Sequence, residues 1–184
     1  MKELYYLDAN ALIKYSYYQD LLDFHGKQET GVKVIRSLIE NQQGIFYCHH
    51  FALLECYHVL LAHYRDNQKC KLFGDKPVKQ RHSLELILNQ FFSAFKKSDL
   101  KLENTPLSAE LLIAAQKIIL NYGMKTELSD RKKVDSMDMI HIALVKQLSK
   151  KYQQSVIIVT SDKAMKTICD YENIPFFDPE IISE

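Results

Sequence analysis

A run of apolar, β-branched residues near the carboxyl end of the chain constrains the fold most. Residues 155–160 read Ser-Val-Ile-Ile-Val-Thr, with four apolar residues in succession. A strand that is buried on both faces has such an unbroken run, whereas a strand with one solvent-exposed face alternates apolar and polar residues. Because helices cover both faces of a parallel sheet, this stretch predicts a buried strand in the centre of a parallel α/β sheet.

Other segments repeat the pattern of a short apolar strand that is followed by a helix. Residues 4–7 lead into a helical pattern over 11–18, and residues 45–49 lead directly into another. A short strand at 100–104 and a proline-containing edge strand at 174–177 complete the predicted sheet. We therefore expect a three-layer α/β/α fold around a central, mostly parallel sheet.

Apolar residues at helical spacing predict most of the remaining structure. In addition to the helix that follows the strand at 45–49, helices are expected over residues 32–39, 84–95, 108–122, 136–148 and 163–171. Thr30 is the predicted N-cap of the first of these, and Gly123 is the predicted end of the third.

The whole chain, residues 1–184, is predicted to form a single domain. A length of 184 residues suits one domain with a full core, and the 47% hydrophobic content is that of a globular protein. Residues 65–101 begin as an irregular, base-rich stretch and then regain helical spacing. They form a predicted helical insertion in the middle of the domain.

Composition also limits the class of protein. No apolar run reaches the roughly 20 residues that cross a bilayer, and the first residues lack the basic start of a targeting signal. We therefore expect a cytoplasmic protein without a membrane partner. A net charge of +1 gives no global attraction for nucleic acid, so a phosphate-binding surface would have to be local. The cysteines lack C-x-x-C spacing and are expected to be buried free thiols: Cys48, Cys56, Cys70 and Cys169.

Four acids stand where the predicted topology brings strand ends together. Asp8 and Asp162 follow predicted strands, and Glu55 lies in the second turn of the helix after a third strand. Asp138 opens the helix that leads into the strand at 155–160. The carboxyl ends of parallel strands lie at one edge of the sheet, so these four carboxylates are expected to converge there.

Converging carboxylates repel one another unless a cation neutralises them. A set of carboxylates without His or Cys partners suits Mg²⁺ or Mn²⁺, which prefer oxygen ligands. Such a metal lowers the pKa of a bound water and stabilises a leaving oxygen, which is the chemistry of phosphodiester hydrolysis.

Four segments around these acids resemble, in order, the acidic motifs of PIN-domain nucleases, and VapC-like toxin ribonucleases most of all. The segments are Leu7–Lys14, Leu54–Glu55, Met137–Ala143 and Val159–Asp162. The resemblance implies that Asp8, Glu55, Asp138 and Asp162 are catalytic residues that bind Mg²⁺ or Mn²⁺, with Asn10 and Thr160 as supporting polar groups. It also implies RNA as the substrate, and an antitoxin protein and a second copy of the chain as candidate partners.

The chain departs from this pattern in two places. Residues 65–101 make it longer than a compact VapC-like toxin. Asp135 lies one turn before Asp138 and competes for its role, although Asp138 fits the D-x-x-H-x-A pattern better.

Basic loops at 69–81 and 131–133 are ordinary solvated surface unless they border the acids, where they would hold RNA phosphates.

Two other functions stay open. The first is a PIN-like scaffold that binds RNA or a protein without cutting. The second is a phosphatase with an aspartyl nucleophile, but Asn10, interpreted at first as a helix cap, stands where the D-x-D pattern of haloacid dehalogenases has its second acid.

Single residues also have purely structural interpretations. Asp162 is as well suited to capping a helix, and Asp138 to compensating a helix dipole. His141 is expected to be packed or to support the site rather than to bind a metal. Lys14 is expected to be either a phosphate contact or a solvated helix residue.

Overall fold

The computed structural model describes residues 2–16, 27–65, 100–125 and 136–181, and the single residues 89, 93, 95 and 96. The strands are β1 (Glu3–Leu7), β2 (Gly44–His49), β3 (Lys101–Glu103), β4 (Val156–Val159) and β5 (Phe176–Phe177). The helices are α1 (Ala9–Ser16), α2 (Lys27–Glu40), α3 (His50–Arg65), α5 (Ala109–Lys125), α6 (Ser136–Tyr152) and α7 (Lys163–Glu172).

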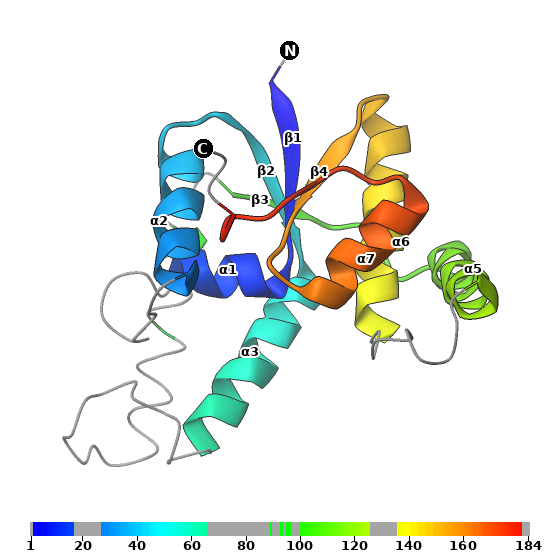
Figure 1. Ribbon diagram of the computed structural model, residues 1–184, viewed down its shortest axis with the longest axis horizontal. Helices are drawn as coiled ribbons and strands as arrows, with labels where there is room; N and C mark the ends of the chain where they lie inside the picture. The colour runs from blue at the N-terminus through cyan, green and yellow to red at the C-terminus, as the bar shows by residue number, and fades with distance from the viewer. Residues whose placement is uncertain are drawn as a thin grey trace.

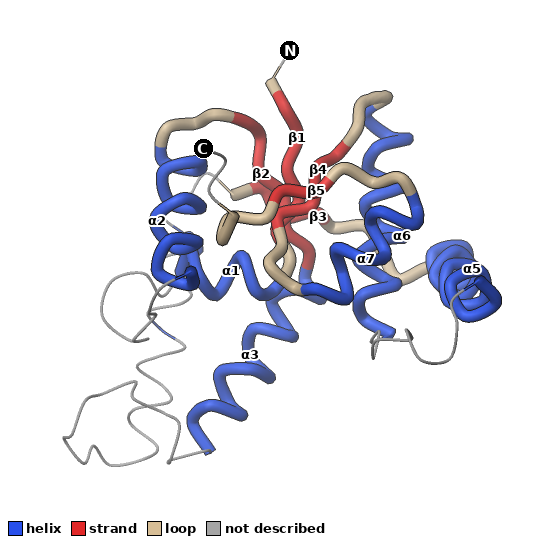
Figure 2. Tube along the Cα trace, in the orientation of Figure 1, coloured by secondary structure: helices blue, strands red, loops and turns tan. Residues whose placement is uncertain are grey.

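The five strands form one parallel sheet in the order β3-β2-β1-β4-β5 (Figures 1 and 2). β1 is therefore the central strand, and it pairs with β2 on one side and β4 on the other. Since all the described strands run the same way, their carboxyl ends share one edge of the sheet. The predicted α/β fold is confirmed, and the described sheet is wholly parallel.

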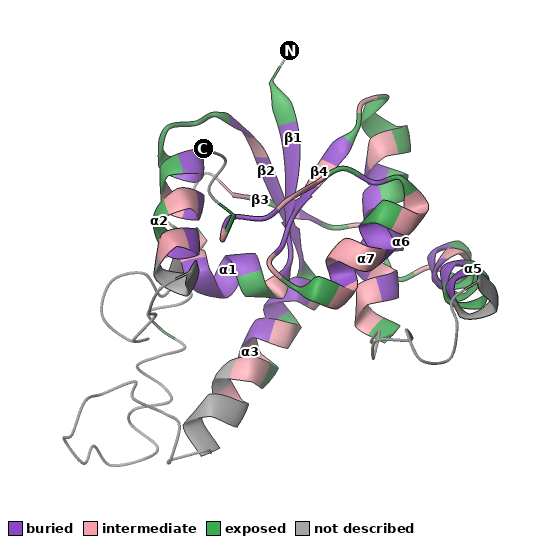
Figure 3. Ribbon diagram, in the orientation of Figure 1, coloured by how far each residue is buried: buried purple, intermediate pink, exposed green. Residues whose placement is uncertain are grey.

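Helices cover both faces of the sheet and create two separate cores. Tyr5 and Leu7 of β1 pack with residues of α1, α2 and α3 on one face. Tyr6 of β1 and Ile158 of β4 pack with residues of α5, α6 and α7 on the other. Alternation along each strand places neighbouring residues on opposite faces, which is why β1 contributes to both cores. Figure 3 shows β1 and β4 buried along most of their length.

The apolar run at 156–159 forms β4, as its sequence predicts. Val156, Ile158 and Val159 are completely buried. The short strand β5 pairs with β4 and forms the edge of the sheet, as the proline-containing segment predicts. The strand expected at 100–104 is also present, as β3 at the opposite edge.

Two predicted helix boundaries are wrong. Thr30 lies inside α2, which begins at Lys27, because the residues before Thr30 are good helix formers that extend the helix backward. Gly123 lies inside α5, which continues to Lys125. A glycine inside a helix costs only about 1 kcal/mol relative to alanine, so it does not by itself end one.

Several expectations concern residues outside the described part of the chain. Most of the 65–101 insertion, both basic loops, Asp135 and Cys70 belong to this group. The other three cysteines are buried free thiols, as expected. None of the helices in the described segments combines the length and apolar character needed to cross a membrane.

Candidate functional site

Asp8 ends the central strand and caps the helix that follows. It comes directly after β1, and its Oδ1 accepts a hydrogen bond of 2.7 Å from the backbone N–H of Ala11. This is the contact that an N-cap residue makes with the third residue of its helix. The sequence-based assignment of the cap to Asn10 is wrong, because α1 already begins at Ala9 and Asn10 lies within its first turn.

The Asp8 carboxyl group is buried, with only 5% of the residue exposed. This burial raises its pKa from 3.8 to about 6. Hydrogen bonds from the Thr160 hydroxyl and the Ala11 N–H lower the pKa, as does attraction to His141 and Lys14, but they do not offset the burial. Asp8 therefore holds a proton much more readily than an exposed aspartate does.

A pocket of about 670 Å³ opens at the carboxyl edge of the sheet beside Asp8. Its lining includes all four acids that the sequence singled out: Asp8, Glu55, Asp138 and Asp162. They come from the end of β1, from α3, from the first turn of α6 and from the start of α7. The expected convergence at one edge is thus present, while the catalytic and metal-binding roles of the acids stay predictions.

Glu55 is held by a histidine from another helix. The Nε2 atom of His141 lies 2.7 Å from Glu55 Oε2, and the His141 Nδ1 atom lies 2.6 Å from the Tyr6 hydroxyl. His141 is 1% exposed, so it is a buried residue with a polar partner at each ring nitrogen. The expectation that it is packed is confirmed. Sequence reasoning missed its link to Tyr6, because no local pattern connects residues 135 positions apart.

Asp162 has the structural role that its sequence position allowed as an alternative. It is the N-cap of α7, and its Oδ1 accepts hydrogen bonds from the backbone N–H groups of Ala164 and Met165. Its own N–H donates to the Thr160 hydroxyl oxygen at 3.1 Å. Thr160 is fully buried and links Asp162 to Asp8 through its hydroxyl group.

Lys14 is neither solvated nor positioned as a free phosphate contact. Only 3% of it is exposed, and its Nζ donates to Asn10 Oδ1 at 2.7 Å, Ser161 Oγ at 2.8 Å and Glu180 Oε1 at 2.5 Å. An ammonium group has three hydrogens to donate, so all of them are used within the protein. Lys14 thereby ties α1 to the β4–α7 connection and to the carboxyl-terminal segment, and Asn10 accepts one of its bonds.

The rest of the pocket is mainly apolar. Phe51 and Leu54 of α3 line it, together with Met137 of α6 and Met165 of α7. Leu54 precedes Glu55 and is 59% exposed, which is unusual for a large apolar side chain in a folded domain. The pocket therefore combines carboxylates with an apolar wall.

The four carboxylates match a hard divalent cation in donor type and in placement around one pocket. Within the described residues, however, no three His, Cys, Asp or Glu side chains are arranged to hold a metal ion. One oxygen each of Asp8, Glu55 and Asp162 already accepts a hydrogen bond or lies in an ion pair. The residues fit Mg²⁺ or Mn²⁺ chemically, and side-chain movement would have to bring them to coordination distance.

Comparison with protein-family models gives no match for this chain, and a search of curated proteins gives none either. The similarity to PIN-domain nucleases therefore rests on the four acidic segments and their order.

Proposed function

We propose that this protein is a ribonuclease that hydrolyses phosphodiester bonds with the help of Mg²⁺ or Mn²⁺. Asp8, Glu55, Asp138 and Asp162 would hold the cation. One observation carries the proposal: these acids come from four separate segments of the chain and line the same pocket at the carboxyl edge of a parallel sheet. That edge is where open α/β sheets bind their ligands.

The environment of Asp8 supports the proposal. A carboxylate is costly to bury unless it is paired with a positive charge. The Lys14 ammonium group, whose attraction lowers this pKa, is tied to Glu180, and the pKa of Asp8 stays raised at about 6. A divalent cation in the pocket would favour the ionised carboxylate and would supply an activated water for attack on phosphorus.

The neighbouring residues would keep the site in shape. The Thr160 hydroxyl and the Ala11 N–H bond to Asp8 and orient its carboxyl group. The α7 N-terminus holds one oxygen of Asp162. RNA as the substrate, and an antitoxin or a second copy of the chain as a partner, rest on the resemblance of the acidic segments to those of VapC-like toxins.

The test is an RNA cleavage assay of the purified protein and its Asp8→Asn variant. Structured and single-stranded RNAs are incubated with Mn²⁺, with Mg²⁺ or with a chelator. Asp170→Asn is the matched control, because Asp170 is an exposed acid of α7 that does not line the pocket. We expect cleavage to depend on the metal and to fall by more than about a hundredfold in Asp8→Asn. This loss would be larger than the loss caused by removing a group that only orients a metal ligand. Equal cleavage by wild type and Asp8→Asn would refute the proposal.

A second candidate is a PIN-like scaffold that binds RNA or a protein without cutting. The observation in its favour is that no three potential ligands are gathered for a metal among the described residues. This function predicts RNA retention in a filter-binding assay, no metal-dependent cleavage, and binding that is unchanged in Asp162→Asn.

A further inference from the structure

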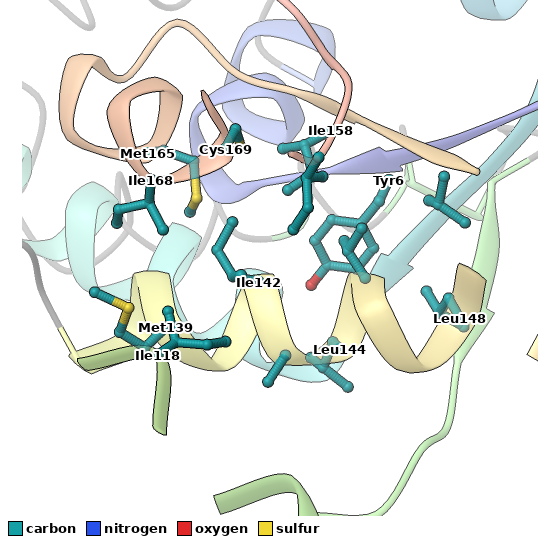
Figure 4. Close-up of a cluster of buried hydrophobic side chains, with 14 of the residues drawn as sticks. Tyr6, Ile118, Met139, Ile142, Leu144, Leu148, Ile158, Met165, Ile168 and Cys169 are labelled. Carbon is teal, nitrogen blue, oxygen red and sulfur yellow. The ribbon is translucent and has the colours of Figure 1, made fainter. Parts of the chain in front are cut away.

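Tyr6, His141 and Glu55 form a chain of side chains that runs from the core of the domain to the pocket. They belong to three elements that are far apart in the sequence: β1, α6 and α3. Tyr6 is completely buried, and Figure 4 shows its hydroxyl group directed toward α6 within the apolar cluster. Glu55, at the other end, has 26% of its side chain exposed and lines the pocket.

The hydrogen-bond chemistry of the chain selects one form of His141. A neutral imidazole has one nitrogen that donates and one that accepts. An ionised carboxylate only accepts, so Nε2, at 2.7 Å from Glu55 Oε2, has to carry the hydrogen. Nδ1 then accepts, and the Tyr6 hydroxyl at 2.6 Å is its donor.

The state of Tyr6 agrees with this assignment. Tyr6 is completely buried, and its phenolic O–H is a donor for the His141 Nδ1 atom. In the opposite tautomer, the lone pair of Nε2 would face the lone pairs of Glu55 at hydrogen-bond distance, which is repulsive. Of the two neutral tautomers, only the Nε2–H form leaves all three side chains with compatible partners.

We propose that Tyr6 and His141 are positioning residues that orient Glu55 as a cation ligand, an inference that rests on the proposed function. Tyr6 holds His141 as the Nε2–H tautomer, and His141 holds Glu55 through Oε2. The other carboxylate oxygen, Oε1, is thereby left to coordinate a divalent cation in the pocket. Tyr6 does not line the pocket, and the two ring nitrogens of His141, which does line it, are engaged by Tyr6 and Glu55, so both residues act through Glu55. In metal sites, side chains that hydrogen-bond to a metal ligand orient it in this way.

The alternative is that His141 competes with a cation for Glu55. The two arrangements predict opposite effects when Tyr6 is changed. A positioning role predicts that Tyr6→Phe weakens cation binding, because His141 is released from one orientation. Competition predicts that the same variant strengthens binding, because Glu55 is freed.

The first measurement is the ¹⁵N NMR spectrum of His141 in the full-length protein. It is recorded at about pH 8. We expect the Nε2–H tautomer in wild type and a mixture of tautomers in Tyr6→Phe. Tyr5→Phe is the matched control, since Tyr5 is the neighbouring residue of β1 on the opposite face and its hydroxyl donates to Glu3. An Nδ1–H tautomer or an imidazolium in wild type, or no difference between the two variants, overturns the assignment.

The second measurement is a titration with Mn²⁺ alone, followed by the electron paramagnetic resonance signal of the free ion. We expect Tyr6→Phe and His141→Leu to bind Mn²⁺ about tenfold more weakly than Tyr5→Phe. His141→Gln, which keeps an N–H donor for Glu55, should recover part of the loss, and it carries the test if Tyr6→Phe does not fold. Unchanged or tighter Mn²⁺ binding in both His141→Leu and Tyr6→Phe overturns the positioning role.

The two readouts separate this inference from the function on which it rests. Wild-type protein that binds no Mn²⁺ overturns the proposed cation site, and with it the role of Glu55 as a ligand. The NMR result is independent of any cation and decides by itself whether Tyr6 orients His141.

Discussion

Asp8 and Asp178 occupy corresponding places in the sheet and differ in their surroundings. Each comes directly after a strand, Asp8 after β1 and Asp178 after β5, and each is buried, with 5% and 8% of the residue exposed. The pKa of Asp8 is raised to about 6, mainly by burial. Burial acts to raise the pKa of Asp178 as well, but hydrogen bonds from Lys166, the Glu180 N–H and Ser161, together with attraction to Lys166, lower it overall.

The comparison distinguishes a structural carboxylate from a candidate functional one. Asp178 forms an ion pair with Lys166 and so ties the carboxyl-terminal segment to α7. Asp8 has hydrogen-bond donors but no such direct ion pair among the described residues, and it lines the pocket with three other acids. Carboxyl groups with a shifted pKa cluster at functional sites, and Asp8 is therefore the candidate functional carboxylate of the two.

The largest effect is expected when the buried charge of Asp8 is removed. The folded-state pKa of about 6 lies above the unfolded value of 3.8, so ionised Asp8 destabilises the fold above pH 6 and costs nothing below 3.8. Asp8→Asn should therefore stabilise the protein by up to about 3 kcal/mol near neutral pH. The gain should shrink as the pH falls from 6 to 4.

Urea unfolding of both proteins at several pH values measures this difference. Asp178→Asn provides the contrast, since its wild-type pKa is lowered and its replacement should destabilise the fold near neutral pH. A stability gain for Asp8→Asn that is the same at all pH values would contradict burial of the charge as the cause of the raised pKa.

A slightly smaller effect is expected from Lys166→Met, which leaves Asp178 without its cation. Breaking a buried ion pair on one side is destabilising, and the partial exposure of Lys166 limits the loss to about 2 kcal/mol. Chemical denaturation is the measurement, with Lys163→Met as the control because Lys163 is exposed on the same helix. Equal stability of the two variants would show that Asp178 does not depend on Lys166.

Addition of Mn²⁺ should stabilise wild type and leave Asp8→Asn unchanged. A ligand that binds only the folded state stabilises it by about 1.4 kcal/mol at ten times its Kd. Thermal unfolding with and without Mn²⁺ measures the shift in Tm, and Asp178→Asn should respond as wild type does. An equal shift in Asp8→Asn would place the ion elsewhere on the protein.

The smallest effect is expected on the pKa of Asp8 itself. Lys14 lowers this pKa by attraction, and it is the weakest of the contributions. Lys14→Met should therefore raise the pKa of Asp8 slightly further. Carbon NMR of the Asp8 carboxyl group over a pH series measures it, and a fall in the pKa would contradict attraction to Lys14 as one of the causes that lower it.

Much of the architecture was predictable because it depends on short-range patterns. The unbroken apolar run of β4 requires cover on both faces, and strand-then-helix units require a parallel sheet. Parallel strands share one carboxyl edge, so the approach of Asp8, Glu55, Asp138 and Asp162 to one pocket followed from their positions after strands and in early helical turns. These inferences need only the period of the side chains and the direction of the chain.

Contacts between distant residues were decided only by the tertiary structure. The sequence leaves Lys14 as a surface residue or a phosphate contact, whereas packing buries it against Glu180, 166 positions away. Likewise, no pattern links His141 to Glu55, 86 positions away, or to Tyr6. Burial and hydrogen-bond partners depend on which helices meet at the sheet edge, and that information is not local. The sequence by itself thus determined which acids lie at the carboxyl edge of the sheet. The tertiary structure determined that Glu55 is paired with His141, that Asp162 caps a helix and that the pKa of Asp8 is raised.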